Sequence, residues 1–152
     1  MKDSFGISRL FALATLGVAL LIPVVGQAAQ PAAGSATAAE HKLVIQMSDA
    51  DPKKWNLALN NAKNVQDAYG KDKVAIEIVA YGPGIGMLKM DSEVGNRVNE
   101  AVANGVTVMA CGNTMNAQKL TKKDMLDSVG YVLTGVVELM EKQQQGYSYI
   151  RP

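Results

Sequence analysis

The sequence predicts an α/β fold, a three-layer sandwich in which a mostly parallel sheet of about five strands lies between helices. Short apolar runs rich in Val and Ile alternate along the chain with longer segments whose apolar residues recur every three or four positions. The connections between these segments are short and contain Gly, Pro, Asn or Asp. Strands that alternate with helices in this way usually pair in parallel.

The first strand is expected at residues 42–47, and a helix follows it. Asp51 has the side chain of a helix N-cap, and Pro52 suits the first helical position. The helix is expected to end at Gly70. Its apolar face is predicted from residues spaced three and four apart, namely Trp55, Leu59, Ala62, Val65, Ala68 and Tyr69.

The second and third strands are expected at residues 73–81 and 106–111. The second strand stops at a turn formed by Gly82, Pro83 and Gly84. A helix that begins near Ser92 and ends around Asn104 and Gly105 connects the two strands. The third strand ends at Cys111, and Asn113 or Thr114 is expected to cap the helix that follows.

The last part of the domain contains weaker signals of the same kind. Thr121 and Asp124 have the spacing of a capping box before a short helical turn. A fourth strand is expected at residues 131–133, then a helix that ends at Gly146, then a strand at 147–150. Right-handed crossovers place the loops after parallel strands on one edge of the sheet. The loops at 48–51, 82–86 and 111–114 are therefore expected to converge.

The N-terminal residues have the layout of a secretory signal peptide. Lys2 and Arg9 precede an uncharged apolar stretch, residues 10–25, and small residues lead to Ala28. We expect cleavage after Ala28, so that residues 1–28 form the signal peptide. The alternative is a retained membrane anchor, although this stretch falls just short of the roughly 20 residues that a membrane span needs.

After the signal peptide, residues 29–40 are rich in Ala, Gly, Ser, Thr and Pro and predict a flexible leader. One domain is expected at 41–152. The chain has 15 basic and 14 acidic residues, and cleavage makes the mature chain formally neutral. This balance gives no reason to expect a nucleic acid or an anionic membrane as partner. We expect a periplasmic or secreted protein.

Cys111 is the only cysteine. At the carboxyl end of a strand, where ligands bind in open α/β sheets, a thiol can meet unpaired N–H groups and the positive end of a helix dipole. A single cysteine in an oxidising compartment leaves three alternatives. It is a buried inert thiol, a bridge to another chain, or a thiol kept for chemistry.

Other kinds of chemistry are not favoured by the sequence. The glycine loop at 82–86 matches neither the Walker nor the dinucleotide motif. His41 is the only histidine and precedes the first strand, far from Cys111 in sequence, so a hydrolase or a zinc site is not expected. Four methionines occupy positions expected in the core: Met47, Met109, Met125 and Met140. We therefore expect no metal and no cofactor.

Three motifs together resemble the exported branch of the DsrE/DsrF-like proteins, which are related to small subunits of bacterial sulfur-relay complexes. The first two are Tyr81-Gly82-Pro83-Gly84 and Ala110-Cys111-Gly112-Asn113-Thr114. The third is the C-terminal segment from Gly135 to the end of the chain. The resemblance covers residues 41–152. Many relatives have a histidine where this chain has Tyr81.

The resemblance implies a three-layer α/β fold, homo-oligomers that are commonly trimers or hexamers, and a role for Cys111 in carrying sulfur as a persulfide. A sulfur donor or acceptor protein would be the partner. The expected binding residues are Gly112, Asn113 and Thr114, with Gly82, Pro83 and Gly84 as the opposing wall of a cleft. The alternative is a non-catalytic oligomeric module that binds a small ligand or a protein, with Cys111 as a packing residue.

Overall fold

The structure is a computed structural model that describes residues 39–152. Its sheet has five parallel strands in the order β4-β3-β2-β1-β5. The strands are β1 (His41–Met47), β2 (Val74–Ala80), β3 (Thr107–Cys111), β4 (Gly130–Val132) and β5 (Ser148–Ile150). The α-helices are α1 (Pro52–Tyr69), α2 (Gly95–Ala103), α3 (Gly112–Ala117) and α4 (Gly135–Gln144). Short 3₁₀ helices are η1 (Lys71–Lys73), η2 (Gly82–Leu88) and η3 (Lys122–Asp124).

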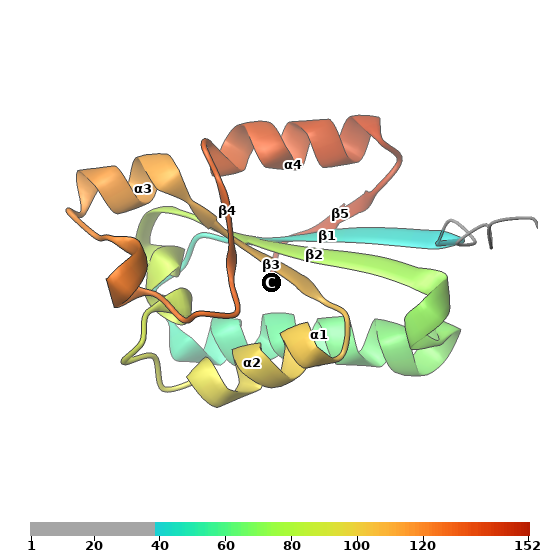
Figure 1. Ribbon diagram of the computed structural model, residues 1–152. Helices are drawn as coiled ribbons and strands as arrows, with labels where there is room; N and C mark the ends of the chain where they lie inside the picture. The colour runs from blue at the N-terminus through green and yellow to red at the C-terminus, as the bar shows by residue number, and fades with distance from the viewer. Residues whose placement is uncertain (1–38) are drawn as a thin grey trace, which may run out of the picture. The chain divides into compact units, whose positions relative to one another are not determined.

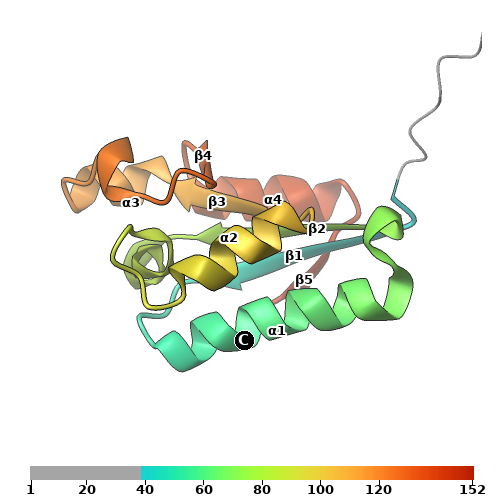
Figure 2. The same ribbon diagram turned by 60° about the horizontal axis from the view of Figure 1, so that its bottom comes forward.

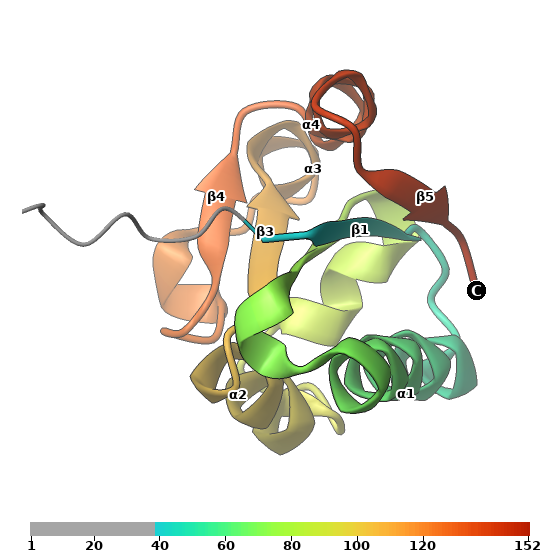
Figure 3. The same cartoon turned by 90° about the vertical axis from the view of Figure 1, so that its right-hand side faces the viewer.

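The helices form layers on both sides of the sheet, which confirms the predicted three-layer α/β fold. Helices α1 and α2 lie side by side on one face, and α3 and α4 lie on the other (Figures 1 and 2). Figure 3 looks toward the sheet from one end and shows the two layers on opposite sides. The predicted signal peptide, 1–28, and most of the predicted leader, 29–40, lie outside the described residues.

The main hydrophobic core lies between the sheet and the layer of α1 and α2. Ile45, Ile78 and Val98 are fully buried there. The core under α4 is much smaller and consists of Val44, Val79 and Leu139. Alternate residues of each strand point to opposite faces, so the same strands supply both cores.

Several element boundaries agree with the local signals in the sequence. The Asp51 carboxylate accepts a hydrogen bond from the Lys53 N–H at 2.9 Å and caps α1. Gly70 ends this helix with a φ of 92°, a conformation that favours glycine. Thr121 and Asp124 form the predicted capping box around η3.

Four local predictions were wrong. Ala68 and Tyr69, expected on the apolar face of α1, are exposed in its last turn, where Tyr69 stacks on His41. Cys111 itself occupies the N-cap position of α3, because this helix starts directly after β3 and places Asn113 and Thr114 in its first turn. Helix α2 begins at Gly95 rather than near Ser92. The Met140 side chain is 55% exposed, because the face of α4 on which it lies has no neighbouring element in residues 39–152.

Among the described residues, no helix has the length and apolar character that a membrane crossing requires.

Candidate functional site

Cys111 lies at the carboxyl end of β3, as the sequence predicted. The strand pairs with β2 on one side and β4 on the other, so the ends of three strands meet here. Tyr81 follows β2, and Gly135 begins α4 after β4. A Cβ atom added to Gly135 would lie 3.3 Å from the Cys111 Cβ and 3.2 Å from the Tyr81 Cβ. Glycine at position 135 thus lets α4 start close to the thiol without crowding Tyr81 or Cys111.

The sulfur atom of Cys111 is surrounded by hydrogen-bond donors from two helix starts. The N–H of Gly135, at the start of α4, donates to Sγ over 3.3 Å. The hydroxyl of Thr114 and the backbone N–H groups of Asn113 and Thr114, in the first turn of α3, also face this sulfur. N–H groups at helix starts carry partial positive charge, which favours an anion.

These donors change the acidity of the thiol. Burial raises the pKa of Cys111, since the side chain is only 4% exposed. The hydrogen bonds from Thr114, Gly135 and Asn113 oppose burial and outweigh it, so that the pKa is lowered overall. The hydrogen-bond donors around Cys111 thus favour the thiolate more than burial disfavours it.

Thr114 connects two of the predicted site segments. Its hydroxyl oxygen accepts a hydrogen bond from the Gly82 N–H at 2.9 Å, while the hydroxyl hydrogen is free to point at Cys111. Gln118, one turn further along the chain, donates to the carbonyl of Gly82 at 3.3 Å. The start of η2 is thus hydrogen-bonded to α3 and its C-cap residue, and the first turn of α3 lies beside the Cys111 sulfur.

Asn113 ties α3 to the segment between β4 and α4. Its N–H donates to the Leu133 carbonyl at 3.0 Å, and its side-chain amide donates to the Thr134 hydroxyl oxygen at 3.0 Å. Gly112 starts α3 next to the end of β4. These contacts hold the N-terminus of α4 in place against Cys111.

The remaining residues predicted for the site lie further from the sulfur. Pro83 is exposed in η2. Gly84 packs against the end of β1, where an added Cβ would lie 2.3 Å from the carbonyl oxygen of Met47. Gly84 therefore joins η2 to β1, and among the three residues of the predicted wall only Gly82 is bonded to the helix beside Cys111.

Gly135 and Thr134 are site residues that the local sequence pattern did not reveal. Gly135 is 24 positions from Cys111, and its contact with the sulfur depends on β4 pairing beside β3. The local signal in the sequence was the Thr-Gly pair before an apolar helical pattern, which is typical of a helix start, and Gly135 also begins the third motif of the family resemblance.

The single histidine is not part of this site. The His41 ring stacks on Tyr69 with a centroid distance of 3.9 Å, at the amino end of β1. Parallel strands place that end opposite to the edge at which Cys111 lies. Within residues 39–152, no three His, Cys, Asp or Glu side chains gather in a way that could hold a metal ion.

Comparisons with known proteins agree with this fold. Residues 41–152 match the DsrE/DsrF-like family. The structure is similar to that of MTH1491 from Methanobacterium thermoautotrophicum, a protein of unknown function, with 33% sequence identity and a TM-score of 0.70. That match covers 74% of this chain and 99% of the other.

Two more distant structures share the fold. BT1422 from Bacteroides thetaiotaomicron, of unknown function, has 18% identity and a TM-score of 0.61, over 73% of this chain and 94% of its own. The ychN protein from E. coli has 15% identity and a TM-score of 0.58, over 74% of this chain and 99% of its own.

No curated protein matches the chain. From the family match across the whole described fold, and from the similarity to MTH1491, it follows that the chain belongs to the sulfur-relay-like DsrE/DsrF-like family.

Proposed function

We propose that this protein binds or relays sulfur on Cys111, as a thiolate and as a persulfide, in the periplasm or outside the cell. The observation that carries the proposal is the position of the Cys111 sulfur between the first turns of α3 and α4, with its pKa lowered by their hydrogen bonds. A sulfur relay needs a stable sulfur anion and no metal or nucleotide.

In the transfer step one sulfur–sulfur bond forms while another breaks. The Cys111 thiolate attacks the outer sulfur of a persulfide or polysulfide donor. The new bond forms between Sγ and that sulfur, the bond inside the donor breaks, and the donor leaves as a thiolate. The transferred sulfur keeps its own proton or charge, so the step needs no external oxidant. Delivery to an acceptor thiolate is the same exchange in reverse.

Intact mass after exposure to inorganic polysulfide tests this proposal. The wild-type protein is expected to gain mass in whole sulfur atoms and to lose it on reduction. The matched variant Cys111→Ser keeps the size of the side chain and is expected to gain nothing while unfolding at the same denaturant concentration. A Cys111→Ser protein that still gains sulfur would contradict the proposal.

A second candidate function rests on the low exposure of Cys111, which is 4%. In this alternative the thiol only packs, and the protein is a binding module. Labelling with a thiol reagent separates the two. If Cys111 reacts only after denaturation and gains no sulfur when folded, the binding module is correct. A bridge between chains, the third alternative, would appear as a dimer on a non-reducing gel.

We also propose that the protein is a homo-oligomer, a trimer or a hexamer. Four apolar side chains at α4 and just before it are exposed, namely Leu133 at 79%, Val136 at 50%, Val137 at 46% and Met140 at 55%. On this face of the sheet, α4 contacts β1, β2, β3 and β5. Met109 of β3 and Val132 of β4 remain only half-buried. Apolar surface of this kind is typical of protein interfaces.

A further inference from the structure

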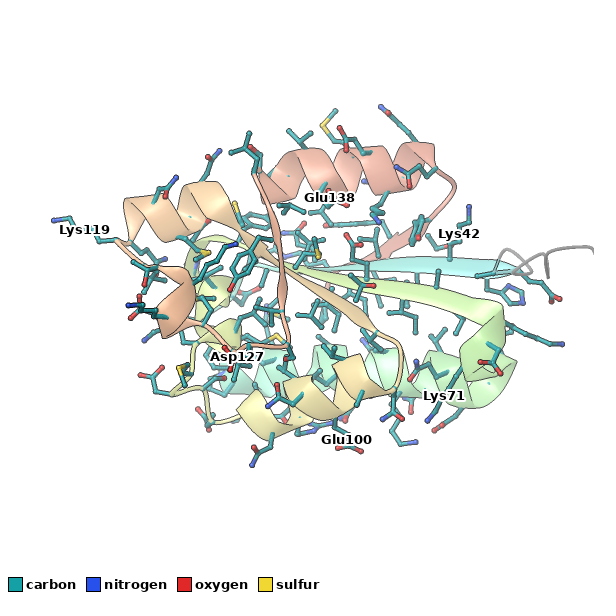
Figure 4. All side chains as sticks on the ribbon, in the orientation of Figure 1. Lys42, Lys71, Glu100, Lys119, Asp127 and Glu138 are labelled. Atoms are coloured by element: carbon teal, nitrogen blue, oxygen red, sulfur yellow. The ribbon has the colours of Figure 1, made fainter. Side chains whose placement is uncertain are left out.

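A groove between α1 and α2 lies on the other side of the sheet from Cys111. Its volume is about 250 Å³. Figure 4 labels Lys71 and Glu100, which line the groove, on the layer of α1 and α2, whereas Glu138 belongs to α4 on the opposite layer. The groove is therefore separate from the sulfur site.

The groove is kept open by small residues. Ala62 of α1 and Ala101 of α2 lie in it, with Leu59 and Val106 completing an apolar floor. Methyl side chains do not fill the space between two helices that larger apolar residues would close. Leu59, Ala62 and Val106 are at most 4% exposed, so the floor offers apolar contact to one short hydrocarbon group.

Two cations at the rim lack acidic partners. Within residues 39–152, Arg97 donates only to the side-chain oxygens of Asn56 and Asn60, the latter over 2.7 Å. Lys71 donates to the side-chain oxygen of Asn104. A guanidinium has five N–H donors and an ammonium three, so both cations keep donors free. The amides hold these side chains in place without neutralising their charge.

The other charged groups of the groove leave it positive. Asp67 is paired with Lys63 over 2.7 Å, which cancels both charges. The remaining charged groups of the lining are one carboxylate, Glu100, and two cations, Arg97 and Lys71, so the net charge of the groove is positive. Gln66 is 6% exposed, and its amide donates to the Asn104 carbonyl at 2.8 Å, so a buried polar group helps to fix the wall.

We propose that this groove binds a small carboxylate anion with a short apolar tail. The carboxylate pairs with Arg97, which its bonds to Asn56 and Asn60 hold at one end of the groove, and the tail lies on the floor formed by Leu59, Ala62, Ala101 and Val106. Lys71, held by Asn104 at the other end, adds positive charge to the groove. Arg binds carboxylates through two parallel N–H groups, which gives such a site its geometry. The cavity is slightly smaller than most ligand pockets, which suits a molecule of a few carbon atoms.

Titration with butyrate, acetate and inorganic phosphate at constant ionic strength, followed by NMR of the protein, tests the proposal. Butyrate is expected to bind most tightly, with a gain of up to about fourfold for each added methylene that reaches the floor. Shifts are expected at the groove residues and not near Cys111, and Cys111→Ser is expected to bind equally well. Phosphate binding as tight as butyrate, or no saturable binding, would contradict the proposal.

Charge variants separate a specific site from general attraction. Arg97→Gln is expected to weaken butyrate binding by about tenfold or more. The control Lys123→Gln removes one exposed cation in η3 and is expected to change nothing. Asp67→Asn frees Lys63 and is expected to tighten binding, a gain that a misfolded protein cannot show. Equal losses in Arg97→Gln and Lys123→Gln, or weaker binding by Asp67→Asn, would disprove the site.

Discussion

Cys111 has two properties that oppose each other. Its side chain is nearly buried, which disfavours the thiolate, yet the donors of Thr114, Gly135 and Asn113 around the sulfur outweigh burial and lower its pKa. Thr114 is central, because its hydroxyl also accepts the Gly82 N–H. The chemistry proposed for this protein therefore depends on groups that do not themselves react.

Replacement of Thr114 by Val keeps the shape of the side chain and removes the hydroxyl. We expect the pKa of Cys111 to rise, since burial is then less opposed. The rate of reaction with iodoacetamide at pH 7 is expected to fall by about tenfold, the usual worth of one hydrogen bond to a charged group. The rate is measured across pH.

Thr114→Ser is the control for this experiment, because it keeps the hydroxyl. It is expected to react like the wild type. At a pH well above the ordinary pKa of a thiol, about 8.5, the wild type and Thr114→Val are expected to converge, since both are then ionised. A rate difference that is the same at every pH would show that Thr114 controls access and not acidity.

At the scale of elements, α4 is held on the sheet by a small buried apolar cluster and an ion pair. Leu139 supplies the buried apolar contact, and the Lys142 ammonium bonds the Glu77 carboxylate of β2 at 2.7 Å. Glu77 is 4% exposed, and burial raises the pKa of its carboxyl despite the nearby lysine. Because α4 also supplies Gly135 to the thiol, this ion pair positions part of the candidate site.

Lys142→Met is expected to lower the free energy of unfolding by about 3 kcal/mol at pH 7, since it leaves a buried carboxylate without its cation. A carboxyl with a raised pKa in the folded state costs stability as pH rises above the unfolded value of about 4.3. The loss is therefore expected to shrink at pH 5. Urea unfolding of Lys142→Met and wild type at both pH values measures it.

The double variant Glu77→Gln with Lys142→Met removes both charges and is expected to recover much of the loss. The exposed-site control Lys123→Met is expected to stay within about 0.5 kcal/mol of wild type. A Lys142→Met loss that is equal at pH 5 and pH 7 would mean that packing, and not the charge of Glu77, is responsible.

The connection of η2 to β1 depends on Gly84. Gly84→Ala would place a Cβ 2.3 Å from the Met47 carbonyl oxygen, which is backbone and cannot rotate away. We expect a loss of about 2 kcal/mol or more in the free energy of unfolding. Thermal and urea unfolding measure this. Gly86→Ala is the matched control: its Cβ would meet only the Trp55 ring, at 3.2 Å, and the loss is expected to be smaller. Equal losses would contradict the explanation.

At the scale of the whole molecule, the two faces of the sheet are unequally covered. The layer of α1 and α2 buries the large core, whereas the layer of α4 leaves Val137, Met140 and Leu133 exposed. A second copy of the chain on this face would remove that apolar surface from water. It would also cover the segment that leads into Gly135, next to Cys111.

Met140→Glu is expected to weaken the proposed oligomer by at least about tenfold, because it loses apolar burial and adds an unpaired charge at the interface. Light scattering coupled to size exclusion measures the mass at several concentrations. The control Leu57→Asp makes a similar change at an exposed apolar residue of α1 and is expected to leave the mass unchanged. A monomeric wild type would refute the proposed oligomer.

The sequence by itself determined the order of elements and the end of β3 at Cys111, because caps, turns and apolar periodicity are local properties. It also indicated the family through three short motifs, which the match over residues 41–152 confirms. The pairing of strands and the approach of distant segments are not local. Only the tertiary structure brought Gly135 to the sulfur and Gly84 beneath Met47.

The same reason explains what sequence reasoning missed elsewhere. The exposure of Met140 depends on what covers α4, and the groove beside Arg97 depends on the spacing between α1 and α2. Periodicity in the sequence shows which residues share the apolar face of a helix, but it does not show which element packs against that face. The chain thus encoded its strands, its helices and the position of Cys111 locally, while the surroundings of that thiol were decided by contacts between residues far apart in sequence.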